Sequence, residues 1–141
     1  MRFMIIVKGD EAYESGAMPT EEQLSAMVKY NEEMVEAGVM VSGEGLHPSS
    51  KGARIEFSGG KPVITDGPFS EAKELVGGFT MIKVDSKEEA LDWVRRWPGA
   101  DGDVLELRQV FEAEDFGDEL TPELREAEER QRVQAAENAA R

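Results

Sequence analysis

The densest group of residues that could do chemistry begins at Asp66, which is followed by Gly67, Pro68 and Phe69. An Asp side chain accepts hydrogen bonds from the amides that follow it, glycine permits unusual backbone angles, and proline fixes its own. Such a run holds a carboxylate and an aromatic ring in a set place. Two interpretations of Asp66 compete evenly: a group that lines a pocket, and a simple turn former.

A second polar group lies near residue 44. Glu44 stands between two glycines, an arrangement that in a strand often marks the close approach of a ligand or of another backbone segment. His47, the only histidine in the sequence, follows on a loop, and Asn31 falls on the apolar stripe of a predicted helix. A carboxylate–imidazole pair can act as a general base and its orienting group. Loop statistics favour a loop-tying role for His47, and Asn31 could equally satisfy a buried backbone group.

We expect these groups to line one pocket between a sheet and a helix, because small-ligand pockets combine rim loops with a few polar groups on apolar walls. The candidate catalytic residues are Asp66, His47 and Glu44. The candidate ligand-binding residues are Asn31, Tyr30, Phe69 and Lys73. The competing interpretation is a solvated position for Lys73 and a packing role for Tyr30.

Composition excludes several classes of protein. A net charge of −14 argues against binding to nucleic-acid phosphates, and the absence of cysteine excludes disulfides and thiolate chemistry. One histidine among carboxylates is weak evidence for a metal, so we expect none, with metal binding through His47 and the acids as a weaker alternative. The sequence shows no cofactor motif, so we expect no cofactor. No apolar run reaches the roughly 20 residues that cross a bilayer, so we expect no membrane association. A cytoplasmic location fits these features.

The hydrophobic pattern predicts strands over residues 2–8, 39–46, 53–57, 62–65, 78–84 and 104–111. One helix is expected from the Thr20 cap to Gly38, with an inward stripe of Leu24, Met27, Val28, Met34 and Val35. Another is expected between a cap at Asp85 or Ser86 and Pro98, with Ala90, Leu91, Val94 and Trp97 facing inward. A further helix starts at Pro122.

Two strand–helix–strand units that flank a hairpin predict an α+β fold, a ferredoxin-like split βαβ sandwich with both helices on one sheet face. Alternation leaves apolar side chains on the other face. Because large exposed apolar areas are rare in monomers, we expect a homodimer that packs these faces together. Residues 1–112 form this domain, and residues 113–141 form a C-terminal extension that is predicted to be helical.

Several segments resemble the YCII-related family, and specifically its DGPF-motif branch: residues 42–46, 65–74, 77–79, 110–112, 115–117 and 121–125. The resemblance covers nearly the whole chain and implies the dimeric α+β barrel fold. Shorter family members carry a His and an Asp proposed as an active-site pair. Here Met27 or a neighbour stands where that His is expected, and Glu36 is the nearest match to the acid.

Two functions follow as hypotheses. The first is a homodimer with a small-molecule pocket, in which any reaction would be acid–base chemistry without a cofactor. The alternative is a non-catalytic regulatory or interaction module that contacts a partner through the tail. Some members of the resembling family accompany extracytoplasmic-function sigma factors, which suggests that kind of partner.

Overall fold

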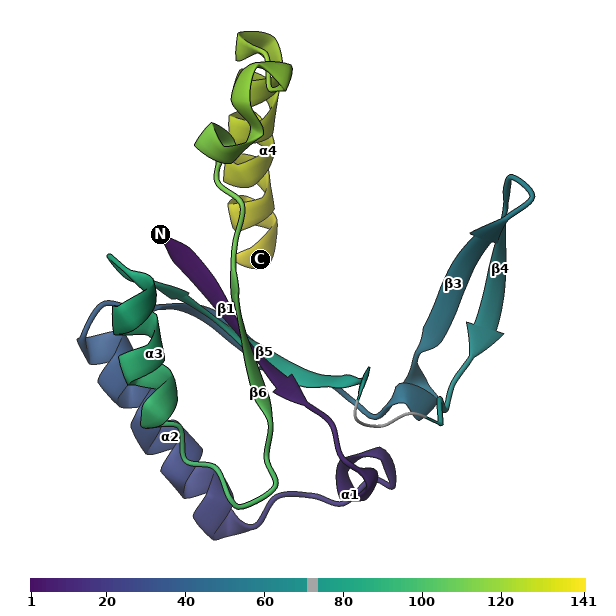
Figure 1. Ribbon diagram of the computed structural model, residues 1–141, viewed down its shortest axis with the longest axis vertical. Helices are drawn as coiled ribbons and strands as arrows, with labels where there is room; N and C mark the ends of the chain where they lie inside the picture. The colour runs from purple at the N-terminus through teal and green to yellow at the C-terminus, as the bar shows by residue number, and fades with distance from the viewer. Residues whose placement is uncertain (71–73) are drawn as a thin grey trace. The chain divides into compact units, whose positions relative to one another are not determined.

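A four-stranded antiparallel sheet with the strand order β2-β5-β1-β6 organises the first part of the structure (Figure 1). The central strands are β1 (Arg2–Lys8) and β5 (Val76–Lys83), and the edge strands are β2 (Met40–Gly45) and β6 (Leu105–Gln109). The computed structural model describes residues 1–70 and 74–141, which divide into two units, Met1–Val110 and Phe111–Arg141. The predicted strands are confirmed, with ends that differ by one or two residues.

The helices begin and end at the predicted caps. α2 (Glu21–Glu36) starts with a capping box, in which Thr20 and Gln23 each accept a hydrogen bond from the other's backbone amide. Gly38, at φ +75°, follows its end. α3 (Lys87–Arg95) is capped by Ser86. The loop expected after β1 contains a short helix, α1 (Glu11–Glu14), capped by Asp10.

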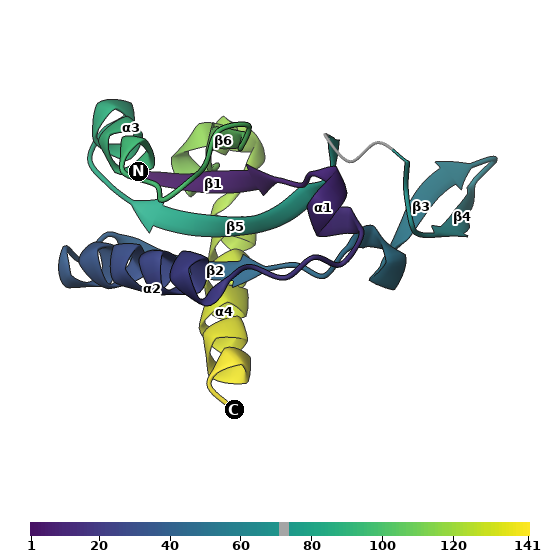
Figure 2. The same ribbon diagram turned by 90° about the horizontal axis from the view of Figure 1, so that it is seen from below.

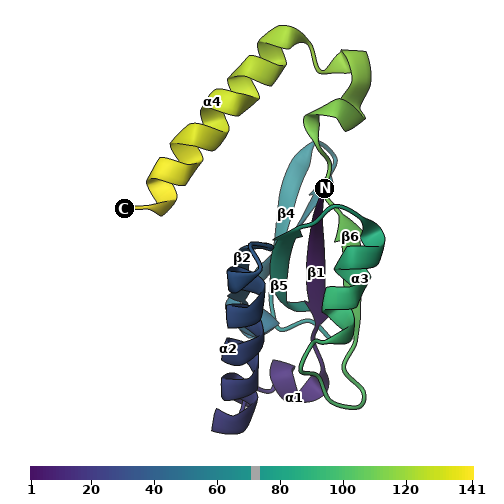
Figure 3. The same cartoon turned by 90° about the vertical axis from the view of Figure 1, so that its left-hand side faces the viewer.

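The core lies between one face of the sheet and both long helices. β1 and β5 direct Phe3, Ile5, Thr80 and Ile82 to this face, where they are buried. The helices contribute Tyr30 and Met34 from α2 and Ala90 and Trp93 from α3. Figure 3 shows the side of the sheet that carries α2 and α3. The arrangement confirms the ferredoxin-like α+β fold.

The face that α2 buries differs from the predicted stripe. Tyr30 and Met34 are buried, whereas Leu24, Val28 and Val35 are more than half exposed. The helix is therefore rotated so that the line through Met27, Tyr30 and Met34 meets the sheet. The large rings of Tyr30 and Trp93 take the central places because they bury more apolar area than Leu or Val. The prediction that Leu24, Val28 and Val35 face inward is wrong for this chain by itself.

The predicted hairpin forms a separate two-stranded sheet of β3 (Ala53–Ser58) and β4 (Lys61–Asp66). Gly59 and Gly60 turn between the strands with φ of +60° and +79°, the backbone that tight hairpin turns require. All residues of both strands are exposed. Figures 1 and 2 both show this hairpin beyond the end of the four-stranded sheet.

The second unit contains a 3-10 segment, η3 (Ala113–Glu119), and α4 (Pro122–Ala139). Thr121 caps α4 and Pro122 occupies its first turn, as predicted. Phe111 stacks on Phe116 with ring centroids 5.1 Å apart. Every residue of α4 is exposed or half-buried. The helix therefore has no buried apolar face of its own. Among the residues that the structure describes, no helix is both long and apolar enough to cross a membrane.

Candidate functional site

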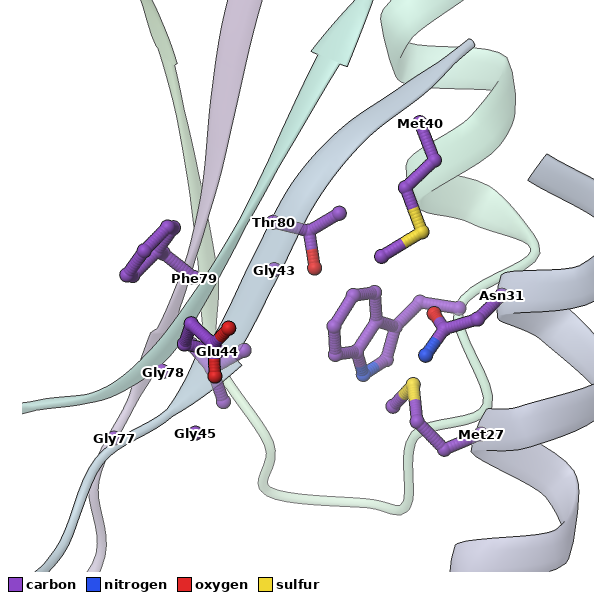
Figure 4. Close-up of a pocket in the computed structure, with 12 residues that line it drawn as sticks. Met27, Asn31, Met40, Gly43, Glu44, Gly45, Gly77, Gly78, Phe79 and Thr80 are labelled. Carbon is purple, nitrogen blue, oxygen red and sulfur yellow. The ribbon is translucent and has the colours of Figure 1, made fainter. Parts of the chain in front are cut away.

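A pocket of about 320 Å³ lies between α2 and the β2–β5 edge of the sheet. Met27 and Asn31 line it from α2, Met40 and Gly43 from β2, and Thr80 from β5. Trp97, which follows α3, completes the wall. Figure 4 shows Met27 and Asn31 reaching from the helix toward the strands and Thr80 directed from the strands toward the helix. The walls are thus mainly apolar, with an amide and a hydroxyl on opposite sides.

The bare backbone of Gly43 keeps this pocket open. A Cβ at Gly43 would come within 3.0 Å of the Met40 Cε and 3.3 Å of the Thr80 Oγ1. Any larger residue would displace Met40 or fill the space that the pocket now occupies. Glycine at position 43 therefore leaves room on the side of β2 that faces the pocket.

The Asn31 side chain is the unusual polar group of the pocket. Its Oδ1 is buried and has no hydrogen-bond partner among the described residues. A buried polar atom left without a partner costs about 1–3 kcal/mol. Because an amide carries both donors and acceptors, a half-turn of the group could present either to a bound molecule. A molecule bound in the pocket would remove this cost.

Glu44 lines the same pocket, but its side chain takes another direction. Glu44 pairs with Phe79 in the register between β2 and β5, one place from the pair of Gly43 and Thr80. Since side chains alternate along a strand, Glu44 and Phe79 point to the opposite sheet face. Figure 4 shows both side chains on the far side of the strands from Asn31. The Glu44 carboxylate is exposed there.

Tyr30 belongs to the core and is not among the residues that line the pocket. Its hydroxyl donates a 2.7 Å hydrogen bond to the Trp93 backbone oxygen. Its ring packs edge-on against Trp93 and Trp97, with centroid distances of 6.4 and 5.5 Å. Burial raises the pKa of Tyr30 to about 12; the nearby Arg96 lowers the pKa and Glu33 raises it, both by smaller amounts. Tyr30 thus supports the wall of the pocket from behind.

His47 lies in a second pocket, of about 690 Å³, formed by α1, the loop before α2 and the loop after β2. Its side chain is exposed. Tyr13 lines this pocket, and its hydroxyl oxygen is buried without a hydrogen-bond partner in the described part of the chain. The two pockets are neighbours, because Gly45 and Gly77 line both.

The Asp66–Phe69 segment contacts the loop that holds Ser49. The Phe69 amide donates a 3.0 Å hydrogen bond to the Ser49 hydroxyl oxygen. That hydroxyl and the Ser49 amide both donate to the Glu14 carboxylate, at 2.5 and 2.9 Å. The Arg54 guanidinium lies 4.1 Å from the centre of the Phe69 ring. These contacts fix the base of the hairpin, and Asp66 itself is exposed at the end of β4.

The structure therefore distributes the residues that were expected in one pocket. Asn31 and the Glu44 backbone meet in the first pocket, His47 lies in the second, and Asp66 and Phe69 line neither. Lys73 lies outside the described residues. Thr80 is not among the residues that the sequence predicted for the site. Side chains two residues apart on a strand share a face, so Thr80 lies on the same inward face as Ile82. The described residues contain no group of three or more His, Cys, Asp or Glu that could hold a metal ion.

Comparison with known proteins gives the family. The chain is 33% identical over 100 residues to the "Uncharacterized protein R00369" of Rhizobium meliloti (strain 1021), a match that spans 67% of this chain and 78% of that protein. A solved structure, 5-chloro-2-hydroxyhydroquinone dehydrochlorinase from Burkholderia phenoliruptrix AC1100 in complex with 2,5-dihydroxybenzoquinone, aligns over 82% of this chain and 98% of its own. Its TM-score is 0.44 and its identity 14%, too low to bear on function. The YCII-related domain matches residues 1–114, and the chain belongs to the YCII-related family.

Proposed function

We propose that this protein is a homodimer that binds a small, uncharged and largely apolar organic molecule in the pocket beside Asn31. The observation that carries the proposal is the buried Asn31 amide oxygen, which lacks a hydrogen-bond partner among the described residues. Buried polar groups nearly always have a hydrogen-bond partner. Where the protein offers none, a ligand or an ordered water can supply the missing hydrogen bond.

The lining indicates the class of molecule. Met27, Met40 and Trp97 offer polarisable apolar surface, and methionine adapts to ring-shaped ligands. Asn31 and Thr80 supply polar contacts to one or two hydroxyl or carbonyl groups. Among the described residues that line the pocket, Glu44 is the only charged one, and its side chain points away. An uncharged ring compound with polar substituents fits this arrangement best.

The volume of the pocket agrees with this class. Pockets for small organic ligands commonly measure about 300–1,000 Å³. The value here, about 320 Å³, lies at the lower end and suits a single ring or a small fused pair. Acid–base catalysis by Asp66, His47 and Glu44 stays a prediction, and binding has the better support because none of these three side chains points into this pocket.

Two apolar faces support the homodimer. On the sheet face away from the helices, the register places Met4 beside Met81 and Ile6 beside Phe79. On the hairpin, Ile55 faces Ile64 and Phe57 faces Pro62, and all four are exposed. A two-stranded hairpin is at best marginally stable alone, so its apolar face needs a cover. A second copy of the chain would cover both faces at once.

The alternative function is a regulatory or interaction module that uses the C-terminal unit. The feature that favours it is α4, whose Leu124 and Val133 are more than half exposed. A sigma factor stays one candidate partner. We also propose, from the Asp66–Phe69 segment, that the chain is a member of the DGPF-motif branch of the family. Affinity capture with and without residues 118–141 tests this function; equal recovery of a partner by both forms would remove the tail from consideration.

The proposed binding is tested by a thermal-shift screen of the full chain against small neutral ring compounds. A ligand at a hundred times its dissociation constant adds about 2.7 kcal/mol, which is readily visible as a raised melting temperature. Asn31→Leu should weaken binding at least tenfold and so reduce this stabilisation to about half or less. The unliganded variant should melt at the wild-type temperature or above, because the substitution removes an unsatisfied group. Lys29→Leu, on an exposed position of the same helix, serves as the control and should keep the shift. Hits that persist unchanged in Asn31→Leu would contradict the proposal.

A further inference from the structure

We propose that the second pocket, lined by Tyr13 and His47, is a separate binding site for an uncharged apolar molecule that carries a carbonyl group, with the Tyr13 hydroxyl as its hydrogen-bond donor. This site does not depend on the Asn31 pocket, because the polar groups that define the two sites come from different elements. Asn31 and Thr80 of the first pocket lie on α2 and β5, whereas Tyr13 lies on α1 and His47 on the loop after β2.

The pocket is large and mostly apolar. Its volume is about 690 Å³. The apolar part of its lining is formed by Ala12, Ala17, Met18, Pro19, Leu46 and Pro48. Met18 is 84% exposed and Leu46 is 44% exposed, so apolar side chains face solvent around the cavity. A bound apolar molecule would remove this area from water, which is worth about 25 cal/mol per Å².

The Tyr13 hydroxyl is the polar group of this pocket that lacks a partner among the described residues. The residue is held in place at its backbone, where the Tyr13 amide donates a 2.7 Å hydrogen bond to the Asp10 Oδ1. Its ring lies against Gly77, where a Cβ would be 3.6 Å from the Tyr13 Cζ. The neighbouring Glu14 carboxylate is already engaged by Ser49 at 2.5 and 2.9 Å. The Tyr13 ring is thus held in the wall of the pocket, and the hydrogen-bonding capacity of its hydroxyl is unused among the described residues.

The charge around Tyr13 decides which ligand groups can bind beside its hydroxyl. Burial raises the pKa of the Tyr13 hydroxyl, and the Glu14 carboxylate raises it further, so the group is protonated and donates at neutral pH. The Glu14 carboxylate places negative charge near the hydroxyl, and Asp10 lines the same pocket, so a carboxylate or phosphate ligand is disfavoured. An uncharged acceptor is required, and a carbonyl oxygen is the strongest common one. The site therefore suits a ketone, an aldehyde or an amide on an apolar body.

The test uses 6-propionyl-2-(dimethylamino)naphthalene, an uncharged fluorophore with one ketone, whose emission shifts to the blue in apolar surroundings. Titration of the full-length protein should show saturable binding with one site per chain. Tyr13→Phe removes the donor alone and should weaken binding roughly five- to tenfold, the effect of one hydrogen bond. The unliganded variant should melt at the wild-type temperature or above, because an unsatisfied hydroxyl has been removed.

Two controls separate this site from the first pocket and from non-specific adsorption. Asn31→Leu should leave the affinity for the ketone probe unchanged, whether or not that substitution abolishes ligand binding in the other pocket. The matched probe 2-(dimethylamino)naphthalene, which lacks the ketone, should bind wild type and Tyr13→Phe equally. The proposal is overturned if the ketone probe does not saturate, if Tyr13→Phe binds it as tightly as wild type, or if its affinity depends on Asn31 instead.

Discussion

Gly67 lies directly against the backbone of Ser49: a Cβ at Gly67 would come within 1.8 Å of the Ser49 carbonyl oxygen. The Gly67 amide also donates a 3.0 Å hydrogen bond to the Gly52 carbonyl. The glycine of the Asp66–Phe69 segment is therefore required by close packing of two backbone segments. The segment joins the hairpin to the rest of its unit, and the two pockets lie elsewhere.

Gly67→Ala should be strongly destabilising, because one backbone segment would have to move by more than an ångström. We expect a loss of about 2 kcal/mol or more in the free energy of unfolding, measured by urea denaturation. Gly52→Ala is the matched control, since a Cβ there would lie 3.6 Å from the same Ser49 oxygen, an ordinary contact. Equal denaturation midpoints for the two variants would show that the packing described here is wrong.

Ser49→Ala should destabilise the same junction by a different route. It removes the hydroxyl that accepts from the Phe69 amide and donates to the Glu14 carboxylate. The Phe69 amide and the Glu14 carboxylate that lose this partner are partly buried, so the expected loss in the free energy of unfolding is about 1–3 kcal/mol. Ser15→Ala, whose exposed hydroxyl donates to the Ala12 carbonyl at 2.8 Å, should cost far less. Similar losses for the two variants would argue against a structural role for the Glu14–Ser49–Phe69 contacts.

Tyr30 predicts a loss of stability at high pH. Its pKa is about 12 in the folded protein against 10.0 ordinarily, so the unfolded chain releases this proton first. Stability from the protonated phenol is complete below pH 10 and falls as the pH rises through 10 to 12, by roughly 3 kcal/mol in total for a pKa difference of about two units. Tyr30→Phe should flatten this part of the pH profile, at the cost of the hydrogen bond to Trp93. Parallel profiles for wild type and variant in this range would rule out the assignment.

Substitutions on the two faces of the hairpin should differ in their effect on dimer formation. Phe57→Lys places a charge on the apolar face and should shift the protein toward monomers in light scattering at micromolar concentration, because Phe57 is 78% exposed and needs a cover. Val63→Lys changes the other face, where Val63 lies opposite Glu56, and should leave the mass unchanged. If Phe57→Lys has the same mass as wild type, the hairpin lies outside the interface.

Local signals predicted most of the fold. The Thr20 cap, Gly38, the Gly59–Gly60 turn and the start of α4 at Pro122 are each set by one or two residues acting on their own backbone. Alternation in β1 predicted apolar side chains on both faces of the strand, and the packing of α2 and α3 then buries the face with Phe3 and Ile5. The two strand–helix–strand units around a hairpin predicted the ferredoxin-like α+β fold.

The site was less predictable because it depends on the rotation of α2 against the sheet. Apolar spacing on α2 allowed Leu24, Val28 and Val35 to face inward, and only the packing of Tyr30 against Trp93 and Trp97 decides otherwise. That rotation still brings Asn31 to the pocket. The separation of His47 from Asn31 depends on loop paths, for which the sequence offers no periodic signal.

The most direct test of the proposed function is a calorimetric titration of the best neutral ring compound from the thermal screen into wild type, Asn31→Leu and Lys29→Leu. Binding through the buried amide predicts one site per chain, at least a tenfold weaker dissociation constant in Asn31→Leu, and no change in Lys29→Leu. Equal affinity in all three proteins would contradict the central claim that the unsatisfied Asn31 amide marks the ligand site.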